Sequence, residues 1–456
     1  MTAATASVQN RPPRIAVIGG GLAGLAAAWH AEAAGFRVRV FEAGSRPGGP
    51  ALGWRDGPRL FEYTPSLLEL DTPLLAWIAS LGLGPALHPA LPVARRQLVL
   101  RQGRYMPLMD TPLAFMLSRR VDRESKHSVL RQSLGLLRRS PPVLPDEVAP
   151  RVRQILGDWF NDYMVAPWLA ASQGADAESA WMALALADVA DTSSRLALAR
   201  QLYALRQIPC HGFRHGLDTL TDTLSARVDV RLNQPVGALI RRAHGWCVVT
   251  GMETFEADLV ILAVSAREAA LLLAPSFSQI AASLAAVRYS PMIHVHSVYA
   301  REDVAHRLRA GGAWHPQVEH PFALGVEFVS AQLAHRAADD EVLLCARLGG
   351  MTQPERMGLD DAVLGLLLDS ELDGLLGIQA APLARHIHRQ RHAFPHPDAA
   401  LARARQQLPA LGHARVLVAS DWAAGAGPVA VLRHAMRLPE QARATLNGPQ
   451  VLIEEA

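Results

Sequence analysis

The chain is poor in cysteine and in lysine. Its three cysteines, Cys210, Cys247 and Cys345, are far apart and form no C-x-x-C pair. This pattern excludes a disulfide framework and favours a reduced, cytoplasmic setting. Lys126 is the only lysine, so nearly all the basic residues are arginine. Because no lysine-rich run or basic-aromatic alternation occurs, the sequence predicts no nucleic-acid partner.

Long hydrophobic runs are also missing. Nowhere do about 18 uncharged apolar residues follow one another, so we expect no membrane-spanning helix. Hydrophobic residues make up 50% of the chain and charged residues 19%, which is typical of a globular protein. At 456 residues the chain is long enough for two or three packed domains.

The strongest pattern in the chain lies between residues 14 and 43. Residues 15–18 form a short apolar, β-branched run that predicts a buried parallel strand. Residues 22–33 are rich in helix formers, and residues 37–41 predict a second strand that ends at Glu42. This order of strand, glycine turn, helix, strand and acid is typical of a dinucleotide-binding unit.

Each glycine of the turn has a structural role in such a unit. Gly19 allows the tight turn, Gly21 lets a pyrophosphate approach the backbone, and Gly24 lets helix and strand pack closely. Glu42 can accept hydrogen bonds from ribose hydroxyls. The sequence therefore predicts an ADP-containing dinucleotide held by Gly19, Gly21, Leu22, Ala23, Gly24 and Glu42.

The residues after Glu42 indicate which dinucleotide binds. Residues 43–49 resemble the E-x(n)-R-x-G-G-R segment of the flavin amine oxidase superfamily. The resemblance implies FAD, with its diphosphate and ribityl chain beside the glycines. Pro50 stands where the family has arginine, unless Arg46 or Arg55 replaces that cation. The cofactor-binding residues implied here are Ala43, Arg46, Gly48 and Gly49.

Three later segments, residues 61–66, 211–263 and 416–429, are similar to other flavin-binding parts of that superfamily. Residues 61–66 resemble the F-E-x-G-P-N/H-S segment that lies close to the flavin ring in protoporphyrinogen oxidases, with Thr64 in place of glycine. Residues 416–429 resemble the last flavin segment, in which an acid meets the ribityl chain and a helix N-terminus faces the N1–C2=O edge. The resemblance thus implies flavin contacts for Thr64, Pro65, Val236 (at the adenine), Asp421, Gly427 and Val429.

The resemblance also implies the fold. We expect an α/β protein whose Rossmann-like FAD-binding domain is assembled from discontinuous segments, with a substrate domain of mixed sheet plus helices and a helical insertion. The expected division is a flexible leader at 1–13, the FAD-binding domain at 14–88, 211–270 and 405–456, the helical insertion and substrate-access domain at 89–210, and the substrate-binding sheet domain at 271–404.

Candidate substrate-pocket residues are arginines and histidines. The predicted hairpin around residues 97–108 carries arginines that could pair with substrate carboxylates, although a solvated hairpin fits equally well. The strand at 292–298 places two histidines on one face, and a second H-x-H strand follows at 386–388. No acid lies at a spacing that would support a metal site, so none is predicted. The pocket candidates are Arg95, Arg101, His294, His296, His388 and His392.

Residues 115–139 form a basic, weakly amphipathic stretch. Two interpretations remain open: a peripheral contact with a membrane, or a solvated helical face. The sequence does not predict an oligomeric state.

The resemblance implies that the isoalloxazine ring performs the chemistry by taking a hydride at N5. No acid–base dyad stands out, so no catalytic side chain is assigned. The scarcity of lysine matters because many flavin amine oxidases place a lysine near N5. We therefore expect an FAD-dependent oxidoreductase that dehydrogenates a bulky, largely apolar small molecule, similar to protoporphyrinogen or coproporphyrinogen oxidase or to a relative acting on a specialised metabolite. The alternatives are an isoprenoid (squalene- or carotenoid-type) desaturase or dehydroxylase, and a degenerate, non-catalytic partner protein.

Overall fold

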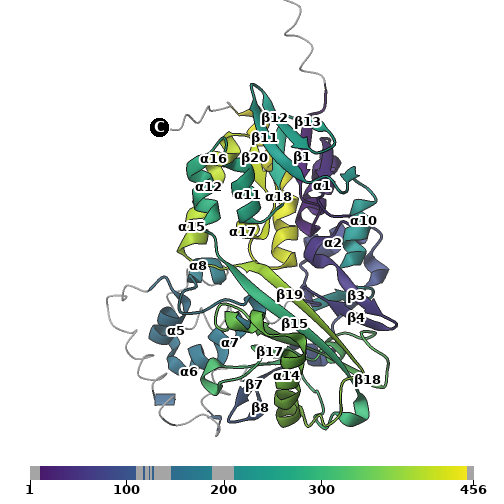
Figure 1. Ribbon diagram of the computed structural model, residues 1–456, viewed down its shortest axis with the longest axis vertical. Coiled ribbons are helices and arrows are strands. Elements are labelled where there is room, and N and C mark those ends of the chain that lie inside the picture. Colours follow the sequence, from purple (N-terminus) through teal and green to yellow (C-terminus); the bar gives the residue numbers. More distant parts are fainter. Residues whose placement is uncertain are drawn as a thin grey trace, which may run out of the picture.

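A parallel sheet of five strands organises one part of the molecule (Figure 1). The computed structural model describes residues 11–108, 117–118, 123, 126–127, 145–186 and 210–448. Parallel neighbours cannot be joined by tight turns, so the chain leaves and re-enters this sheet several times. The strand order is β10 (Val230–Arg231), β2 (Arg37–Phe41), β1 (Arg14–Ile18), β14 (Leu259–Leu262) and β20 (Val416–Val418).

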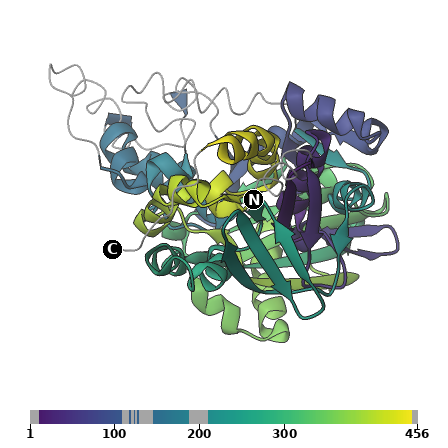
Figure 2. The ribbon, with the colours of Figure 1, turned by 90° about the horizontal axis from the view of Figure 1, so that it is seen from above.

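Both faces of this sheet are covered, as parallel sheets require. Ile15 and Val17 of β1 point into one apolar core, whereas Ala16 and Ile18 point into the other. Figure 2 shows the layers from above. The first core includes α1 (Leu22–Ala33), α2 (Thr72–Ser80), α10 (Asp218–Ser225) and α18 (Pro428–Asn447). The second includes β11 (Val236–Arg242), β12 (Gly245–Thr250), β13 (Thr254–Ala257), α11 (Ala266–Leu273), α12 (Ser278–Ala285), α15 (Ala399–Gln406) and α16 (Leu408–His413).

A second, mixed sheet of seven strands fills the lower part of Figure 1. Its neighbours are antiparallel except for β16 and β7, which are parallel. Ile293 and Val295 lie on the face that packs against α14 (Asp361–Leu376). The strand order is β19 (Ala384–Pro395), β15 (Tyr289–Ala300), β18 (Glu341–Gly349), β17 (Gly325–Glu327), β16 (Gly312–Trp314), β7 (Gln97–Arg101) and β8 (Arg104–Pro107).

Smaller elements connect and flank the two sheets. The hairpin of β3 (Gly53–Asp56) and β4 (Arg59–Glu62) precedes a three-stranded sheet of β5 (Leu68–Glu69), β9 (Cys210–Phe213) and β6 (Leu87–Pro89). A separate apolar cluster joins helices at the left of Figure 1. These are α5 (Val148–Leu156), α7 (Ala166–Gln173) and α8 (Met182–Ala185), with α6 (Asp158–Phe160) and a π-helical turn at Asn161–Val165 beside them. The remaining α-helices of the described residues are α13 (Val329–Gln332) and α17 (Asp421–Ala424).

The predicted strand, helix and strand at the amino-terminal end are confirmed as β1, α1 and β2. The expected hairpin around residues 97–108 is confirmed as β7 and β8, and it forms an edge of the seven-stranded sheet. Among the described residues, no helix combines the length and apolar character needed to cross a bilayer. The basic stretch at 115–139 lies almost wholly outside the described residues.

Candidate functional site

Two glycine loops meet at the carboxyl end of β1. Gly48 N–H donates to the carbonyl of Gly20 at 2.8 Å, and Gly21 and Gly48 form an isolated parallel bridge. A Cβ built on Gly21 would meet only the Gly48 carbonyl oxygen, at 4.0 Å. The backbone is thus bare at the N-terminus of α1, where unpaired N–H groups and the helix dipole favour a phosphate. Leu22 and Ala23 begin that helix.

The other glycines of the turn are required by packing. A Cβ on Gly24 would lie 2.0 Å from the carbonyl oxygen of Gly19 and 3.0 Å from Ala263 Cβ. Gly19 has a φ of +105°, and a Cβ there would lie 2.6 Å from the Ala263 carbonyl oxygen. Helix α1 therefore approaches β1 and β14 more closely than any side chain would allow.

Glu42, at the end of β2, holds the two loops together. Its Oε2 accepts a hydrogen bond from Gly20 N–H at 2.6 Å, and its Oε1 accepts one from Gly44 N–H at 2.7 Å. Both carboxylate oxygens thus bind backbone donors while the side chain stays partly exposed, next to the exposed Ala43. Because each oxygen can accept more than one hydrogen bond, Glu42 keeps capacity for ribose hydroxyls.

The two arginines that could replace the cation missing at Pro50 are each paired with an acid on α10. Arg46 lies 3.6 Å from Asp222, and both side chains are 54% exposed. Arg55 lies 3.2 Å from Asp218, whose pKa is raised by burial. These acids reduce the positive charge that either arginine could offer to a diphosphate.

Val236 opens β11 on the side of the parallel sheet where β2 ends. The connection before it is fixed by two backbone hydrogen bonds, from Asn233 N–H to the Gly44 carbonyl and from Gln234 N–H to the Glu42 carbonyl. Val236 therefore lies near Glu42, which connects the two glycine loops. The resemblance implies that the adenine binds there.

The carboxyl end of β20 leads to Asp421 and then to α18. Burial raises the pKa of Asp421 to about 6, although Trp422 N–H donates to its Oδ1 at 2.7 Å. Gly427, with a φ of +93°, caps α18, and Pro428 is its first residue, followed by Val429. Proline removes one backbone donor from this N-terminus. The helix still presents the positive end of its dipole here.

The segment after β4 carries a buried ion pair. Glu62 and Arg336 lie 2.9 Å apart with side chains 5% and 1% exposed, and Glu62 Oε1 also accepts from Leu217 N–H at 3.0 Å. Thr64 and Pro65, which follow Glu62 closely in the chain, are only partly exposed.

One face of the seven-stranded sheet is polar, opposite the apolar face that covers α14. The register pairs His294 with both Arg347 and His388, and His296 with both Cys345 and His386. Directly paired residues point to the same side of a sheet. The same register places Glu327 of β17 beside Cys345. We call this group the polar face: His294, His296, Glu327, Cys345, Arg347, His386 and His388.

The segment at 61–66 lies against the polar face. The Tyr63 ring stacks on His388 with 3.7 Å between centroids, and Tyr63 Oη is 2.9 Å from His386 Nε2. Phe61 lies against His296, with centroids 5.5 Å apart. Glu62, Thr64 and Ser66 line a cavity together with His294, His296, Glu327, Cys345 and Arg347 of the polar face and with Val329. The cavity, about 10 Å³, has room for about one water molecule.

The histidines of the polar face are uncharged near neutral pH. Burial, helped by neighbouring cationic groups, lowers the pKa of His296 to about 3 and that of His294 well below its ordinary range. Arg347, one of these cationic groups, is held by the Glu327 carboxylate at 2.5 Å and by the Ala171 carbonyl at 2.8 Å.

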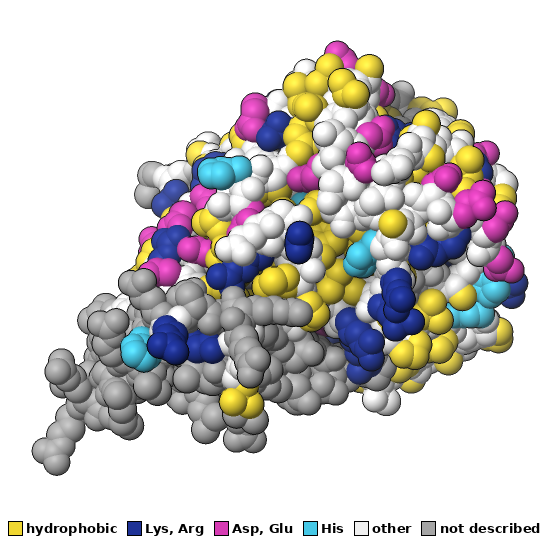
Figure 3. Space-filling view, turned by 90° about the horizontal axis from the view of Figure 1, so that it is seen from below, with side chains coloured by type: hydrophobic (Ala, Val, Ile, Leu, Met, Phe, Trp, Pro, Cys, Tyr) yellow, Lys and Arg dark blue, Asp and Glu magenta, His cyan; other side chains and the backbone are white. Residues whose placement is uncertain are grey.

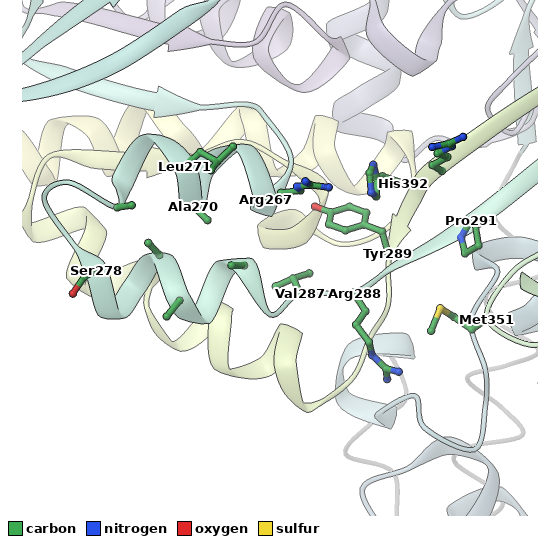
Figure 4. A pocket seen from close by; sticks show the side chains of 15 residues that line it. Arg267, Ala270, Leu271, Ser278, Val287, Arg288, Tyr289, Pro291, Met351 and His392 are labelled. Atoms are coloured by element: carbon green, nitrogen blue, oxygen red, sulfur yellow. The ribbon is translucent and has the colours of Figure 1, made fainter.

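The remaining pocket candidates lie apart from this cluster. Arg95 ends a short 3-10 helix before β7, and Arg101 ends β7 with its guanidinium 5.3 Å from the Tyr163 ring centroid. His392 lies beside Tyr289 at one end of a groove of about 830 Å³ between α11 and α12 (Figure 4). The structure therefore gathers His294, His296 and His388, but not His392.

Charge on the molecular surface is mixed. Basic and acidic side chains both appear on the face shown in Figure 3. A continuous basic surface would be expected of a nucleic-acid-binding protein. Within the described ranges, no cluster of three or more His, Cys, Asp or Glu could hold a metal ion.

Comparison with known proteins shows the family of this chain. The model of one protein family, described as flavin containing amine oxidoreductase, matches residues 22–435. The chain belongs to the flavin-containing amine oxidoreductase family. It is therefore an FAD-dependent oxidoreductase.

Individual relatives agree with this assignment. Protoporphyrinogen oxidase 1, chloroplastic, of Arabidopsis thaliana is 25% identical over 79% of this chain and 74% of its own length. Protoporphyrinogen oxidase 2 of the same plant is 23% identical over 84% of each. The crystal structure of an Exiguobacterium sp. 255-15 protein, provisionally named a protoporphyrinogen oxidase, superposes with a TM-score of 0.80 at 20% identity, covering 96% of this chain and 100% of that one. The last match shows the fold.

The residues present fit FAD. The bare backbone at Gly21, the close approach at Gly24 and the carboxylate at Glu42 form a cradle that a side chain at Gly24 would destroy. Sequence reasoning did not assign site roles to Tyr63, Glu62, Arg336, Glu327 or Arg347. Glu62, the last residue of β4, belongs to the segment at 61–66 that carries the family resemblance, whereas its partner Arg336 is identified only by the fold.

Proposed function

We propose that this FAD-dependent enzyme dehydrogenates a bulky, largely apolar cyclic substrate of the porphyrinogen type. The observation that carries the proposal is the extent of the match to plant protoporphyrinogen oxidases, which covers 79% or 84% of this chain in the two relatives described. At 23–25% identity these matches support a substrate class, so protoporphyrinogen and coproporphyrinogen are both candidates.

The position of the single lysine supports this choice over an amine. Lys126 donates to the Ser118 carbonyl, and no lysine is among the residues of the polar face. The polar face instead carries uncharged histidines, which bind hydrogen-bond donors without repelling a cation that forms during oxidation.

The proposed roles follow from the two halves of the site. We propose that the cradle at Gly19–Gly24, Glu42 and Gly48–Gly49 holds the nucleotide, with Val236 at the adenine end and Asp421, Gly427 and Val429 at the other. When bound, FAD supplies a two-electron acceptor at N5. Thr64 and Pro65 join the cradle to the polar face, whose side chains orient the substrate. Arg95 and Arg101 are proposed to meet substrate carboxylates.

The test is anaerobic bleaching of the flavin absorbance in the purified holoprotein. Protoporphyrinogen, coproporphyrinogen, a squalene-type isoprenoid and a primary amine are compared at equal concentration. We expect a porphyrinogen to bleach the flavin at least about 100-fold faster than the amine, because only it would meet the transition-state contacts of the site. Faster bleaching by the amine or by the isoprenoid would contradict the proposal.

A variant of the single lysine tests the alternative that the enzyme oxidises an amine. If Lys126 were the lysine near N5, Lys126→Ala would abolish bleaching. We expect Lys126→Ala to keep the wild-type rate with the porphyrinogen, because Lys126 donates to the Ser118 carbonyl and the polar face includes no lysine.

A further inference from the structure

Four histidines lie on the polar face, and two of them are already engaged. His386 Nε2 lies 2.9 Å from Tyr63 Oη, and His388 lies under the Tyr63 ring with 3.7 Å between centroids. Tyr63 therefore contacts both imidazoles of β19.

The two histidines of β15 are more deeply buried. His294 and His296 are 4% and 2% exposed, and in the described part of the chain the Nδ1 atom of each has no hydrogen-bond partner. His296 is held by Phe61, with ring centroids 5.5 Å apart, and by the backbone of Glu62 within hydrogen-bonding reach. The His294 ring stacks on that of His388, with 6.5 Å between centroids. An unpaired buried imidazole nitrogen is costly unless a ligand or a water completes it.

His294 also has the position that a ligand-binding group needs. It lines the cavity opposite Thr64 and Ser66, next to the segment proposed to join the cofactor to the substrate. Its cross-strand neighbours are Arg347 and His388. The titratable and charged groups that face it from every packed element are Glu62, Tyr63, His296, Glu327, Cys345, Arg347, His386 and His388.

We propose that the neutral imidazole of His294 accepts the proton that leaves the substrate together with the hydride. This inference rests on the proposed function, because it needs a substrate that loses both. The substrate C–H bond breaks, and its hydrogen and two electrons pass to FAD. The cation left behind holds a much more acidic N–H or C–H, whose proton reaches His294 through the one water for which the cavity has room, as the substrate forms a new double bond.

The weak basicity of His294 suits this role. Burial and the charge of Arg347 lower its pKa, so it remains unprotonated at neutral pH and can accept a proton from a strongly acidic cation. The same surroundings make its imidazolium unfavourable, so the proton passes on to solvent after the product leaves.

The first experiment compares His294→Gln with the wild type and with His413→Gln, the same change at the end of α16. In stopped-flow bleaching with protoporphyrinogen, His294→Gln should lower the rate constant about 100-fold, whereas His413→Gln should not change it. Flavin content and the substrate Kd should stay within about 3-fold in both variants. A rate within about 3-fold of the wild type would overturn the proposal.

A pH profile distinguishes a base from a structural histidine. Because the pKa of His294 is lowered, the wild-type bleaching rate should stay level through the pH range where an ordinary histidine titrates and fall only below it. The fall should be absent in His294→Gln. A purely structural role predicts the same profile for both proteins, and that result would contradict the proposal.

A substrate-free measurement keeps the inference testable if protoporphyrinogen is not the substrate. Wild-type protein that binds FAD but is not bleached by any porphyrinogen contradicts the proposed function alone. Imidazole ¹⁵N NMR, with His294→Gln for assignment, then decides. A neutral ring at pH 6–7 supports a proton acceptor, and an imidazolium there excludes it.

Discussion

The nucleotide cradle and the polar face solve opposite physical problems. The cradle is mostly bare backbone: it excludes side chains at Gly21 and Gly24 so that a ligand and a helix can approach. The polar face is mostly side chain and buries imidazoles and a guanidinium that must find partners inside the protein. The cradle therefore depends on residues that have no side chain. The polar face depends on side chains that strands distant in sequence bring together.

The glutamates of the two regions also differ in burial and in their partners. Glu42 is partly exposed and binds only backbone N–H donors, so its charge is shared with water and a dipole. Glu62 is buried and needs the full charge of Arg336. We therefore expect the cradle to tolerate changes in charge but not in side-chain volume. At the buried pair of Glu62 and Arg336, which we call the junction, we expect changes in volume to be tolerated better than changes in charge.

The largest expected effect tests volume in the cradle. Gly24→Ala places a Cβ 2.0 Å from the Gly19 carbonyl oxygen, so helix α1 must move away from β1. We expect a loss of about 3 kcal/mol or more of unfolding free energy and purification without flavin. Denaturant unfolding and flavin absorbance measure both. Gly412→Ala in α16, where no atom lies within 4 Å, is the control and should be neutral. Flavin-loaded Gly24→Ala protein of wild-type stability would refute this account of the cradle.

The next prediction tests charge at the junction. Arg336→Ala leaves the Glu62 carboxylate buried without its partner, so we expect a loss of about 3–5 kcal/mol in urea unfolding. The exposed pair of Arg153 and Glu178, 2.6 Å apart, is the control. Arg153→Ala should cost at most about 1 kcal/mol. Equal losses in the two variants would remove the contrast between buried and exposed charge.

A smaller effect concerns pH at the end of β20. Burial raises the pKa of Asp421 from 3.8 to about 6, so the folded state is penalised once the unfolded chain has lost this proton. As pH rises from about 4 to 6, cofactor-free wild type should lose about 1–2 kcal/mol relative to Asp421→Asn, and the difference should stay constant above that. Unfolding curves at several pH values measure it. If wild type instead lost stability relative to Asp421→Asn as the pH fell, the raised pKa of Asp421 would be contradicted.

The smallest effect is expected from a substitution that restores one backbone hydrogen-bond donor. Pro428→Ala returns an N–H to the N-terminus of α18, where Pro428 is the first residue. We expect FAD to bind about 2- to 5-fold more tightly in titrations of cofactor-free protein, as one added hydrogen bond would give. Pro354→Ala, at the start of a short 3-10 helix elsewhere, should leave the FAD affinity unchanged. Weaker FAD binding by Pro428→Ala would show that the fixed φ of proline matters more than the donor.

The division into domains at 14–88, 211–270 and 405–456, at 89–210 and at 271–404 stays a prediction. The described strands show one physical reason for care: β7 and β8, from the segment at 89–210, extend the sheet formed mainly by residues 289–395. Strand pairing can thus cross a boundary that composition and prolines suggest.

The sequence by itself determined the cradle. β1, α1 and β2 lie where the pattern predicts them, because the two apolar strands, the glycine turn and Glu42 all lie within about thirty contiguous residues. Family resemblance extended this to FAD, and the family match supports it.

Only the tertiary structure decided the polar face. The alternation of His294 and His296 predicted a shared side but not what lies opposite, because register between distant strands is set by the whole sheet. Arg347 and Arg336 had no local pattern to mark them, since a buried charge is recognised by its partner and not by its neighbours in sequence.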